Sequence, residues 1–347
     1  MKISILLPYK ENFSPIYPGA VSLFLKDTIP LSKFKKKIYV YGNTHYKKKL
    51  LKNYKNLEFK KYFFKSSSNS YLKKFIENED IIKSRIIEIH NRPNYVDKFY
   101  KKNKNIVLYF HNDPLKMKNS ISINDRINLL KKTLIIIFNS NWTLNQFIKG
   151  IKKKYYNNKL KVIHQSTNKK KINFKNKKKI IIFVGRLNKS KGYDIFGNAV
   201  VNILNKFPDW KAIAIGDEPR EKIIFNHKRF KTLGFQNNNI VTNWFKKSEI
   251  SVVCSRIDEP FGRTALEASS AGCAVIITDR GGLPEASSSA IKIKNLSIKN
   301  LQNKIEKLIN NENYRKILQK KIYTGFNLTN ELAAKKIDVY RAKFIKS

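Results

Sequence analysis

Two glutamates, Glu259 and Glu267, lie on either side of the sequence Pro-Phe-Gly, which begins at Pro260. A residue before proline is steered away from the helical conformation, whereas proline itself suits a first helical turn. We therefore expect Glu259 in the entry loop of a helix over residues 261–271, with Glu267 inside that helix. Because helical side chains lean toward the N-terminus, the Glu267 carboxylate should project back toward the start of its helix.

The start of this helix has the residue types of an anion-binding site. We expect Gly262, Arg263 and Thr264 in the first turn, where backbone N–H groups have no intrahelical acceptor and can bind a diphosphate. Two ionised carboxylates beside such a turn accept hydrogen bonds from hydroxyl groups. A diphosphate with hydroxyl groups on either side is the anatomy of a nucleotide-sugar.

A cationic pair follows an earlier apolar run, in Gly-Arg-Leu-Asn-Lys-Ser-Lys-Gly, which contains Arg186 and Lys191. A departing diphosphate gains negative charge as the glycosidic bond breaks, so two cations stabilise it more in the transition state than in the ground state. The sequence has no Asp-x-Asp that would hold a divalent ion against a donor. We therefore expect the cations to replace a metal, and we expect no cofactor.

The elements that must position these residues come from the hydrophobic pattern. Short apolar runs alternate with helix-like segments, which is typical of parallel sheets covered by helices. Strands are expected at 3–7, 37–41, 86–90, 106–110 and 134–139, then at 180–184, 211–215, 250–254 and 274–278, with helices after Gly19, Pro93 and Asn141 and at 192–207, 297–310 and 312–326. In doubly wound sheets, ligands bind beyond the carboxyl ends of the strands.

Composition divides the chain into parts. A chain of 347 residues exceeds what one core usually organises. We predict an N-terminal Rossmann-like domain over 1–165, a linker over 166–179 that is rich in Lys and Asn, and a nucleotide-sugar-binding domain over 180–327. We expect the last segment, 328–347, to form a helix that packs back on the N-terminal domain.

The second domain resembles glycosyltransferase family 4. The resemblance rests on Gly-Arg-Leu-x3-Lys-Gly, on Glu-x7-Glu with Phe-Gly after the first Glu, and on Ala-Gly-x-Ala-Val followed by Gly-Gly-Leu-Pro-Glu. It implies a retaining enzyme of the GT-B fold, with two doubly wound Rossmann-like domains facing a central cleft. It further implies that Glu259 contacts hydroxyls of the transferred sugar and Glu267 the ribose. Phe261, Gly262 and Arg263 would hold sugar or phosphate, and Thr264 the phosphate.

The N-terminal half carries fewer signals. Gly19 follows the first predicted strand and opens a helix, where family members have a small-residue loop that touches the donor. His111 ends another predicted strand and resembles the family histidine that reaches the transferred sugar, although a structural role is an equal alternative. Arg92 and Asp113 are candidates for the acceptor side. Where many members have Asn-Gly before the linker, this chain reads His-Gln-Ser-Thr-Asn, and we carry no donor role onto those positions.

Charge and cysteine content bound the remaining possibilities. The net charge of +46 is compatible with an anionic membrane surface, with nucleic acid, or with a coding sequence biased toward lysine codons. Basic and aromatic residues alternate throughout the chain rather than on one element, which disfavours a nucleic-acid binder. Cys254 and Cys273 lie in apolar segments and are expected to be core residues of a reducing compartment. No signal or membrane segment is found, so we expect a cytoplasmic protein, peripheral on the inner face of the plasma membrane.

The substrates are less determined than the reaction. No Gly-x-Gly-x-x-Gly follows a strand, which disfavours a dehydrogenase. We expect a hexose or N-acetylhexosamine donor, with a UDP-sugar favoured and GDP-mannose as the alternative. The resemblance implies a glycan or lipid-linked acceptor in envelope polysaccharide or lipopolysaccharide synthesis. A sugar-phosphate-binding relative without transferase activity is a further alternative.

Overall fold

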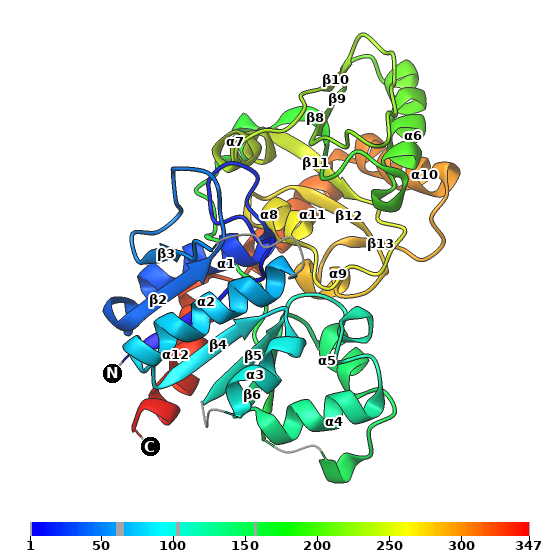
Figure 1. The fold of residues 1–347 in the computed structure, drawn as a ribbon. Coiled ribbons are helices and arrows are strands. Elements are labelled where there is room, and N and C mark those ends of the chain that lie inside the picture. Colours follow the sequence, from blue (N-terminus) through cyan, green and yellow to red (C-terminus); the bar gives the residue numbers. More distant parts are fainter. Residues whose placement is uncertain (1, 60–65, 102–104, 156–157, 347) are drawn as a thin grey trace. The chain divides into compact units, whose positions relative to one another are not determined.

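The computed structural model describes residues 2–59, 66–101, 105–155 and 158–346. The chain forms two compact units (Figure 1). Unit 1 comprises Met1–Ser166 together with Asn330–Ser347, and unit 2 comprises Thr167–Thr329. Each unit is built around its own parallel sheet and has its own apolar core. The two doubly wound, Rossmann-like units that the sequence predicts are therefore both present.

Unit 1 contains a seven-stranded parallel sheet in the order β3-β2-β1-β4-β5-β6-β7. Its central strands are buried on both faces and are rich in isoleucine, as expected for a parallel sheet covered by helices. The strands are β1 (Ile3–Leu6), β2 (Ile38–Gly42), β3 (Tyr54–Asn56), β4 (Ile86–His90), β5 (Ile106–Phe110), β6 (Ile135–Phe138) and β7 (Leu160–Val162).

The α-helices of unit 1 include the last helix of the chain. They are α1 (Ala20–Thr28), α2 (Ser67–Ile82), α3 (Val96–Tyr100), α4 (Ile123–Lys132), α5 (Asn141–Ile148) and α12 (Asn330–Lys346). A buried ion pair fixes α12 to the sheet, because Arg341 donates to both carboxylate oxygens of Glu88 in β4, at 2.7 and 2.8 Å. Asp338 accepts hydrogen bonds from the Ser32 hydroxyl and the Lys33 backbone N–H. The C-terminal helix thus belongs to unit 1.

Unit 2 contains a six-stranded parallel sheet in the order β10-β9-β8-β11-β12-β13. The strands are β8 (Lys178–Val184), β9 (Lys211–Ile215), β10 (Phe230–Thr232), β11 (Ser248–Val253), β12 (Ala274–Thr278) and β13 (Ile291–Ile293). The helices are α6 (Tyr193–Lys206), α7 (Asn238–Lys247), α8 (Arg263–Ser270), α9 (Leu283–Ala286), α10 (Ile298–Asn310) and α11 (Glu312–Thr324). Strands β8 and β11 are central neighbours, so the loops that follow them lie side by side.

The segment expected to be a linker lies against unit 2. The Lys170 backbone N–H donates to the carbonyl of Ser270, and the Tyr323 hydroxyl donates to the carbonyl of Lys170. The ring of Phe174 packs edge-on against Tyr323. This segment is rich in lysine and has few apolar residues such as Phe174, so its composition alone does not indicate that it packs against unit 2.

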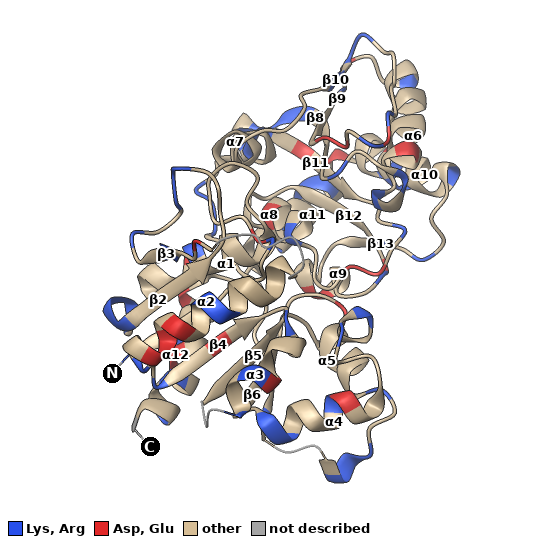
Figure 2. Ribbon diagram, in the orientation of Figure 1, with Lys and Arg blue, Asp and Glu red and all other residues tan. Residues whose placement is uncertain are grey.

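Both cysteines are buried and free, as expected for core residues. Burial raises the pKa of the Cys254 thiol to about 12 and also raises the pKa of Cys273, so both thiols stay protonated at neutral pH. Lys and Arg are spread over the helices and loops of both units rather than gathered on one element (Figure 2). No helix in the described residues is long and apolar enough to cross a bilayer.

Candidate functional site

The centre of the site in unit 2 is an ion pair between Lys191 and Glu259. Lys191 ends a short 3-10 helix, Lys189–Lys191, in the loop after β8, and Glu259 lies in the loop after β11. The Lys191 ammonium contacts Glu259 Oε1, and both side chains are mostly shielded from solvent, with 22% and 13% exposed. Two predicted site residues, 68 positions apart in the sequence, are therefore in direct contact.

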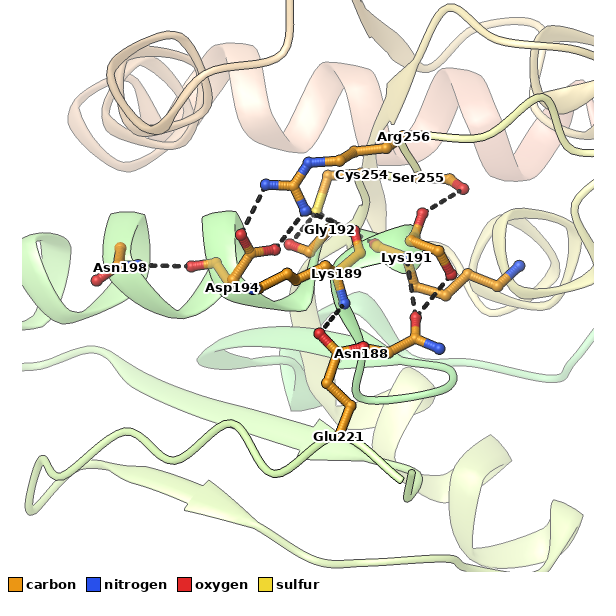
Figure 3. A network of polar contacts seen from close by, with 11 residues as sticks. Asn188, Lys189, Lys191, Gly192, Asp194, Asn198, Glu221, Cys254, Ser255 and Arg256 are labelled. Atoms are coloured by element: carbon orange, nitrogen blue, oxygen red, sulfur yellow. Dashed lines mark hydrogen bonds and ion pairs between the residues drawn. The ribbon is translucent and has the colours of Figure 1, made fainter. Parts of the chain in front are cut away.

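The backbone of the Lys191 loop is held by side chains around it (Figure 3). Asn188 caps the 3-10 helix, because its Oδ1 accepts from the Lys191 N–H at 3.1 Å and from the Ser190 hydroxyl at 2.8 Å. Glu221 accepts from the Lys189 N–H at 3.1 Å. Gly192 has the left-handed conformation, with φ of 74°, and a Cβ there would lie 2.0 Å from the Cys254 carbonyl oxygen. Only glycine permits this approach of the two loops.

Arg256 joins the two loops. Its guanidinium donates to both carboxylate oxygens of Asp194, in the first turn of α6, at 2.5 and 2.6 Å, and it also donates to the Lys189 carbonyl. The Arg256 backbone N–H donates to the Ser190 carbonyl at 3.0 Å. A planar guanidinium suits this bidentate contact better than an ammonium. Arg256 thus holds the loop that contains Lys191 against the loop that contains Glu259.

A third loop, after β9, contributes acidic side chains. Glu218 accepts from Asn188 Nδ2 at 3.1 Å and from Arg220 Nε at 2.7 Å. The hydrogen bond from Arg220 lowers the pKa of Glu218 to about 2, so this carboxylate is ionised at neutral pH. It therefore holds the Asn188 amide in the orientation that leaves Oδ1 free to cap the Lys191 turn.

Two glycines in the loop after β12, Gly281 and Gly282, contact the backbone of the Glu259 loop. Gly281 forms a parallel bridge with Glu259, and the Gly282 N–H donates to the Glu259 carbonyl at 2.6 Å. A Cβ on Gly281, which has φ of 60°, would lie 2.2 Å from that carbonyl oxygen, and a Cβ on Gly282 would lie 2.5 Å from the Pro260 carbonyl oxygen. The Gly-Gly pair is therefore a packing requirement of the Glu259 loop.

The helix after Glu259 begins later than expected. The sequence predicts a helix over 261–271 with Gly262 in its first turn, but α8 begins at Arg263, and Gly262 is the N-cap with φ of 113°. This conformation excludes Gly262 from the helix, and a Cβ there would contact Leu283 at 2.4 Å. Phe261 is buried, with 2% exposed, so its ring belongs to the core. A role for Phe261 in holding a ligand would have to involve its backbone.

Glu267 pairs with another predicted site residue. Arg263 Nε donates to Glu267 Oε1 at 2.8 Å, one helical turn away, and both side chains are largely shielded. Thr264 lies between them in the first turn of α8 and is partly buried. Arg186 differs from the other cations because its side chain is exposed and has no ion pair or hydrogen bond among the described residues. Arg186 could therefore bind a ligand without losing a contact, whereas Glu267 is already paired with Arg263.

Four of the predicted residues lie in unit 1. Gly19 is the N-cap of α1, and the carboxylate of Glu11 occupies the space where a Cβ of Gly19 would lie, at 2.1 Å. Glu11 Oε1 accepts from both the backbone N–H and the hydroxyl of Ser22, each at 2.9 Å. Burial raises the pKa of Glu11, and the bonds from Ser22 and the charge of Arg92 oppose this. Sequence reasoning missed Glu11, because no motif connects it to Gly19.

The other three predicted residues of unit 1 have local partners. His111 is buried, with 6% exposed, and its Nε2 lies 2.9 Å from Nδ1 of His90. Arg92 donates to the Asn91 carbonyl at 2.6 Å. Asp113 caps a short 3-10 helix by accepting from the Leu115 N–H at 3.0 Å. Asp113 therefore has a structural task whatever else it does.

The site residues thus form two groups. Gly19, Arg92, His111 and Asp113 lie in unit 1, and the others, from Arg186 to Glu267, lie in unit 2. In unit 2, a cation and a carboxylate meet at the carboxyl ends of two adjacent strands, beside the start of a helix. Within the described ranges, no three His, Cys, Asp or Glu side chains lie together as metal ligands would.

Residues 164–324 match the family model described as "Glycosyl transferases group 1". Among curated proteins, spore coat protein SA of Bacillus subtilis is 34% identical over 121 residues, which are 31% of this chain and 32% of that protein. An uncharacterized glycosyltransferase of Methanocaldococcus jannaschii is 32% identical over 150 residues, or 37% of this chain and 38% of the relative. The chain thus spans about a third of the length of these relatives.

Solved structures resemble the whole chain. The crystal structure of Anabaena HepE with UDP-glucose has a TM-score of 0.77 at 15% identity, covering 99% of this chain and 100% of that one. WaaG, a glycosyltransferase involved in lipopolysaccharide biosynthesis, has a TM-score of 0.67 at 12% identity, covering 96% and 99%. These similarities confirm the predicted fold class. Residues 164–324 match the group 1 glycosyl transferase family, in a chain whose two Rossmann-like units have the GT-B fold.

Proposed function

We propose that this protein is a retaining glycosyltransferase that moves a hexose or N-acetylhexosamine from a nucleotide-sugar to a glycan or lipid-linked acceptor. The observation that carries the proposal is the contact between Lys191 and Glu259 beside the N-terminus of α8. It lies inside the region that matches the glycosyl transferase family. A site that pairs a cation for phosphate with a carboxylate for hydroxyls suits a sugar diphosphate better than it suits either half alone.

In the proposed reaction each group has a role. Glu259 accepts hydrogen bonds from sugar hydroxyls, and Glu267 from the ribose. Lys191 and Arg186 bind the diphosphate, with Lys191 moving from Glu259 to a phosphate oxygen or bridging both. The bond between the sugar anomeric carbon and the diphosphate oxygen breaks as the acceptor oxygen bonds to the same carbon. The acceptor hydroxyl proton passes to the leaving phosphate oxygen, on the same face of the sugar.

The two cations take the place of a divalent ion in this proposal. Each charged hydrogen bond to the departing diphosphate contributes about 1.5–3 kcal/mol. Arg186 is exposed and without an ion pair among the described residues, so binding a phosphate there breaks no existing contact. We therefore propose that transfer needs neither a metal nor a cofactor.

The donor and acceptor rest on the comparisons. HepE, which has the same fold, has been crystallised in complex with UDP and in complex with UDP-glucose. This supports a UDP-sugar as the donor over the GDP-mannose alternative. WaaG is described as acting in lipopolysaccharide biosynthesis, which supports an acceptor in envelope polysaccharide or lipopolysaccharide synthesis. Such acceptors are made at membranes, and the net charge of +46 would favour an anionic surface. We accordingly propose a cytoplasmic protein, peripheral on the inner face of the plasma membrane.

The test is a screen with isotope-labelled UDP-, GDP- and ADP-sugars in the presence of EDTA, with membrane extracts as the acceptor source. We expect one nucleotide-sugar to be consumed and its sugar to appear in a product identified by mass spectrometry. A reaction that EDTA abolishes and divalent ions restore would refute metal independence. No binding and no hydrolysis of any donor would refute the enzyme. Tight, salt-sensitive RNA binding in its place would establish the nucleic-acid alternative.

A further inference from the structure

Three rings lie on one face of the sheet in unit 1. His90 ends β4 and is paired in register with Tyr109 in β5. Because strand side chains alternate between faces, Tyr109 and His111 point to the same side. The rings of His90 and Tyr109 stack with centroids 4.2 Å apart, those of His90 and His111 with centroids 5.1 Å apart, and Phe24 of α1 meets His111 edge-on. The two histidines are therefore held by packing on several sides.

The contact between these histidines uses one nitrogen of each ring. Nδ1 of His90 and Nε2 of His111 are 2.9 Å apart, so one of these atoms carries a hydrogen and the other accepts it. The outer nitrogens, Nε2 of His90 and Nδ1 of His111, are buried and have no hydrogen-bond partner among the described residues. His111 thus has one ring nitrogen that the protein occupies and one that it leaves unpaired.

The surroundings keep both rings neutral. Burial lowers the pKa of His111 to about 3, and burial, then His111, then Arg341 lower the pKa of His90. Arg341 and Asp338 on α12 and Glu88 on β4 are the charged groups near this face, and Arg341 is paired with both carboxylates. A cation next to His90 disfavours a second positive charge on the ring.

Two neutral rings joined in this way must have matching tautomers. If His90 donates from Nδ1, its Nε2 is bare, and His111 accepts at Nε2 and carries its hydrogen on Nδ1. If His111 donates from Nε2, its Nδ1 is bare, and His90 carries its hydrogen on Nε2. Any mixed combination places two hydrogens or two lone pairs between the rings. Both rings therefore carry their hydrogen on Nδ1, or both carry it on Nε2.

We propose that His90 is a positioning residue that fixes the orientation of the His111 ring and couples the tautomer of His111 to its own, so that Nδ1 of His111 is the atom left to bind a polar group of the substrate. The substrate class follows from the proposed function, on which this inference rests, and is a sugar hydroxyl. In either allowed tautomer pair Nδ1 of His111 can bind a hydroxyl, as a donor when both rings carry their hydrogen on Nδ1 and as an acceptor when both carry it on Nε2.

The tautomer test needs no substrate and is therefore independent of the proposed function. Labelling the five histidines with ¹⁵N and recording long-range imidazole spectra reports which nitrogen of each ring carries hydrogen. We expect His90 and His111 to share one tautomer and to remain neutral from about pH 5.5 to 8, whereas exposed His45 serves as the solvent reference. Different tautomers in the two rings, or a charged ring in this pH range, would refute the pairing.

The functional test compares three replacements of His90. His90→Asn keeps an amide near the position of Nδ1, whereas His90→Gln places its amide near Nε2 and His90→Phe has none. We expect His90→Phe and His90→Gln to lower kcat by about tenfold or more with donor KM changed by less than about threefold, and His90→Asn to recover most of the loss. Circular dichroism checks that each variant is folded. An active enzyme whose kcat is equal in all three variants would overturn the positioning role.

Discussion

Arg256 and Asp194 form a bidentate ion pair, at 2.5 and 2.6 Å, that fixes the Lys191 loop to the Glu259 loop although neither residue is a predicted site residue. The pair is partly exposed, at 38% and 24% of each side chain, so we expect it to add at most about 1 kcal/mol to the free energy of unfolding. Its larger effect should be on the position of Lys191. Arg256→Lys keeps the charge and loses the two-point contact.

The Arg256→Lys variant should therefore lower kcat by about fivefold or more while the urea midpoint changes little. Steady-state kinetics and urea unfolding on the same preparations measure the two effects. Arg229→Lys is the matched control, because the Arg229 guanidinium also makes a two-point contact, with the carbonyls of Pro208 and Leu204, and does not contact the Lys191 or Glu259 loops. If Arg256→Lys and Arg229→Lys have equal kcat, the loops do not depend on the Arg256 bridge.

Lys191→Ala should lower kcat/KM by about 10- to 150-fold, the effect of losing one charged hydrogen bond to the diphosphate. Lys189→Ala removes a lysine from the same turn, whose side chain is exposed, and we expect a change below about twofold. Initial rates with the active donor measure both. Equal losses in the two variants would mean that general positive charge, rather than Lys191 itself, binds the donor.

Glu267→Gln should raise the donor dissociation constant about tenfold, because an amide is a weaker acceptor for the ribose and leaves Arg263 uncompensated. Isothermal titration with the nucleoside diphosphate alone isolates this effect from sugar binding. The control is Glu312→Gln, which breaks another i,i+4 pair in unit 2, with Lys316, that is well exposed. An unchanged dissociation constant in Glu267→Gln would remove the ribose from its role.

Gly281→Ala should impair both folding and activity. Gly234→Ala is the control that separates the cost of the left-handed backbone conformation from the cost of the steric clash. Both glycines have similar left-handed φ values, 60° and 65°, but a Cβ on Gly281 meets the Glu259 carbonyl, whereas a Cβ on Gly234 meets no atom within 4 Å. We expect Gly234→Ala to lose about 1–2 kcal/mol of unfolding free energy from conformation alone. Gly281→Ala should lose about 1–3 kcal/mol more from overpacking.

Donor turnover should separate these glycine variants further, because only Gly281 touches the Glu259 backbone. Chemical denaturation measures stability, and kinetics on the folded fraction measures activity. If both variants are equally stable and equally active, the close approach of Gly281 to Glu259 has no consequence for the site.

Buried His111 should make the free energy of unfolding depend on pH. Its pKa of about 3 in the folded protein lies below the ordinary value near 6.5, so the unfolded chain binds more protons between these values. The contribution of neutral His111 is thus complete above about pH 6.5 and is lost as the pH falls. Between pH 7.5 and 5.0 the loss should be about 2 kcal/mol.

Urea unfolding of the wild type and of His111→Gln at both pH values measures this contribution together with the effect of His111 on the pKa of His90, because the remaining titrating groups are common to the two proteins. We expect the wild type to lose about 2 kcal/mol more than the variant over this interval. Parallel losses would show that His111 is protonated in the folded state.

Much of the architecture follows from local patterns, and the exceptions have physical causes. The central strands are short, nearly continuous apolar runs, the pattern expected of strands buried on both faces of a parallel sheet. The four edge strands, β3, β7, β10 and β13, were missed because each has only three residues, with a lysine in the middle. Helix α2 was missed because Glu79 interrupts its buried face, which otherwise consists of Tyr71, Leu72 and Phe75. Edge elements are decided by tertiary pairing rather than by their own sequence.

The candidate site likewise contains some features that local spacing predicts and some contacts that it does not. The i,i+4 spacing of Arg263 and Glu267 indicates their pairing on a helix, and Pro260 indicates that Glu259 precedes it. The contact of Lys191 with Glu259 joins residues of two loops and depends on the order of β8 and β11 in the sheet, which no local spacing determines. Glu11 beside Gly19 and His90 beside His111 are contacts of the same non-local kind.

The most direct test of the central claim is a double-mutant cycle on Lys191 and Glu259, measured as release of nucleoside diphosphate from the active donor. If both residues act on one bound nucleotide-sugar, Lys191→Ala and Glu259→Gln each lower kcat/KM by about tenfold or more, and the double variant loses much less than the product of the two effects. Independent, fully multiplied effects, or wild-type rates in both single variants, would contradict the account.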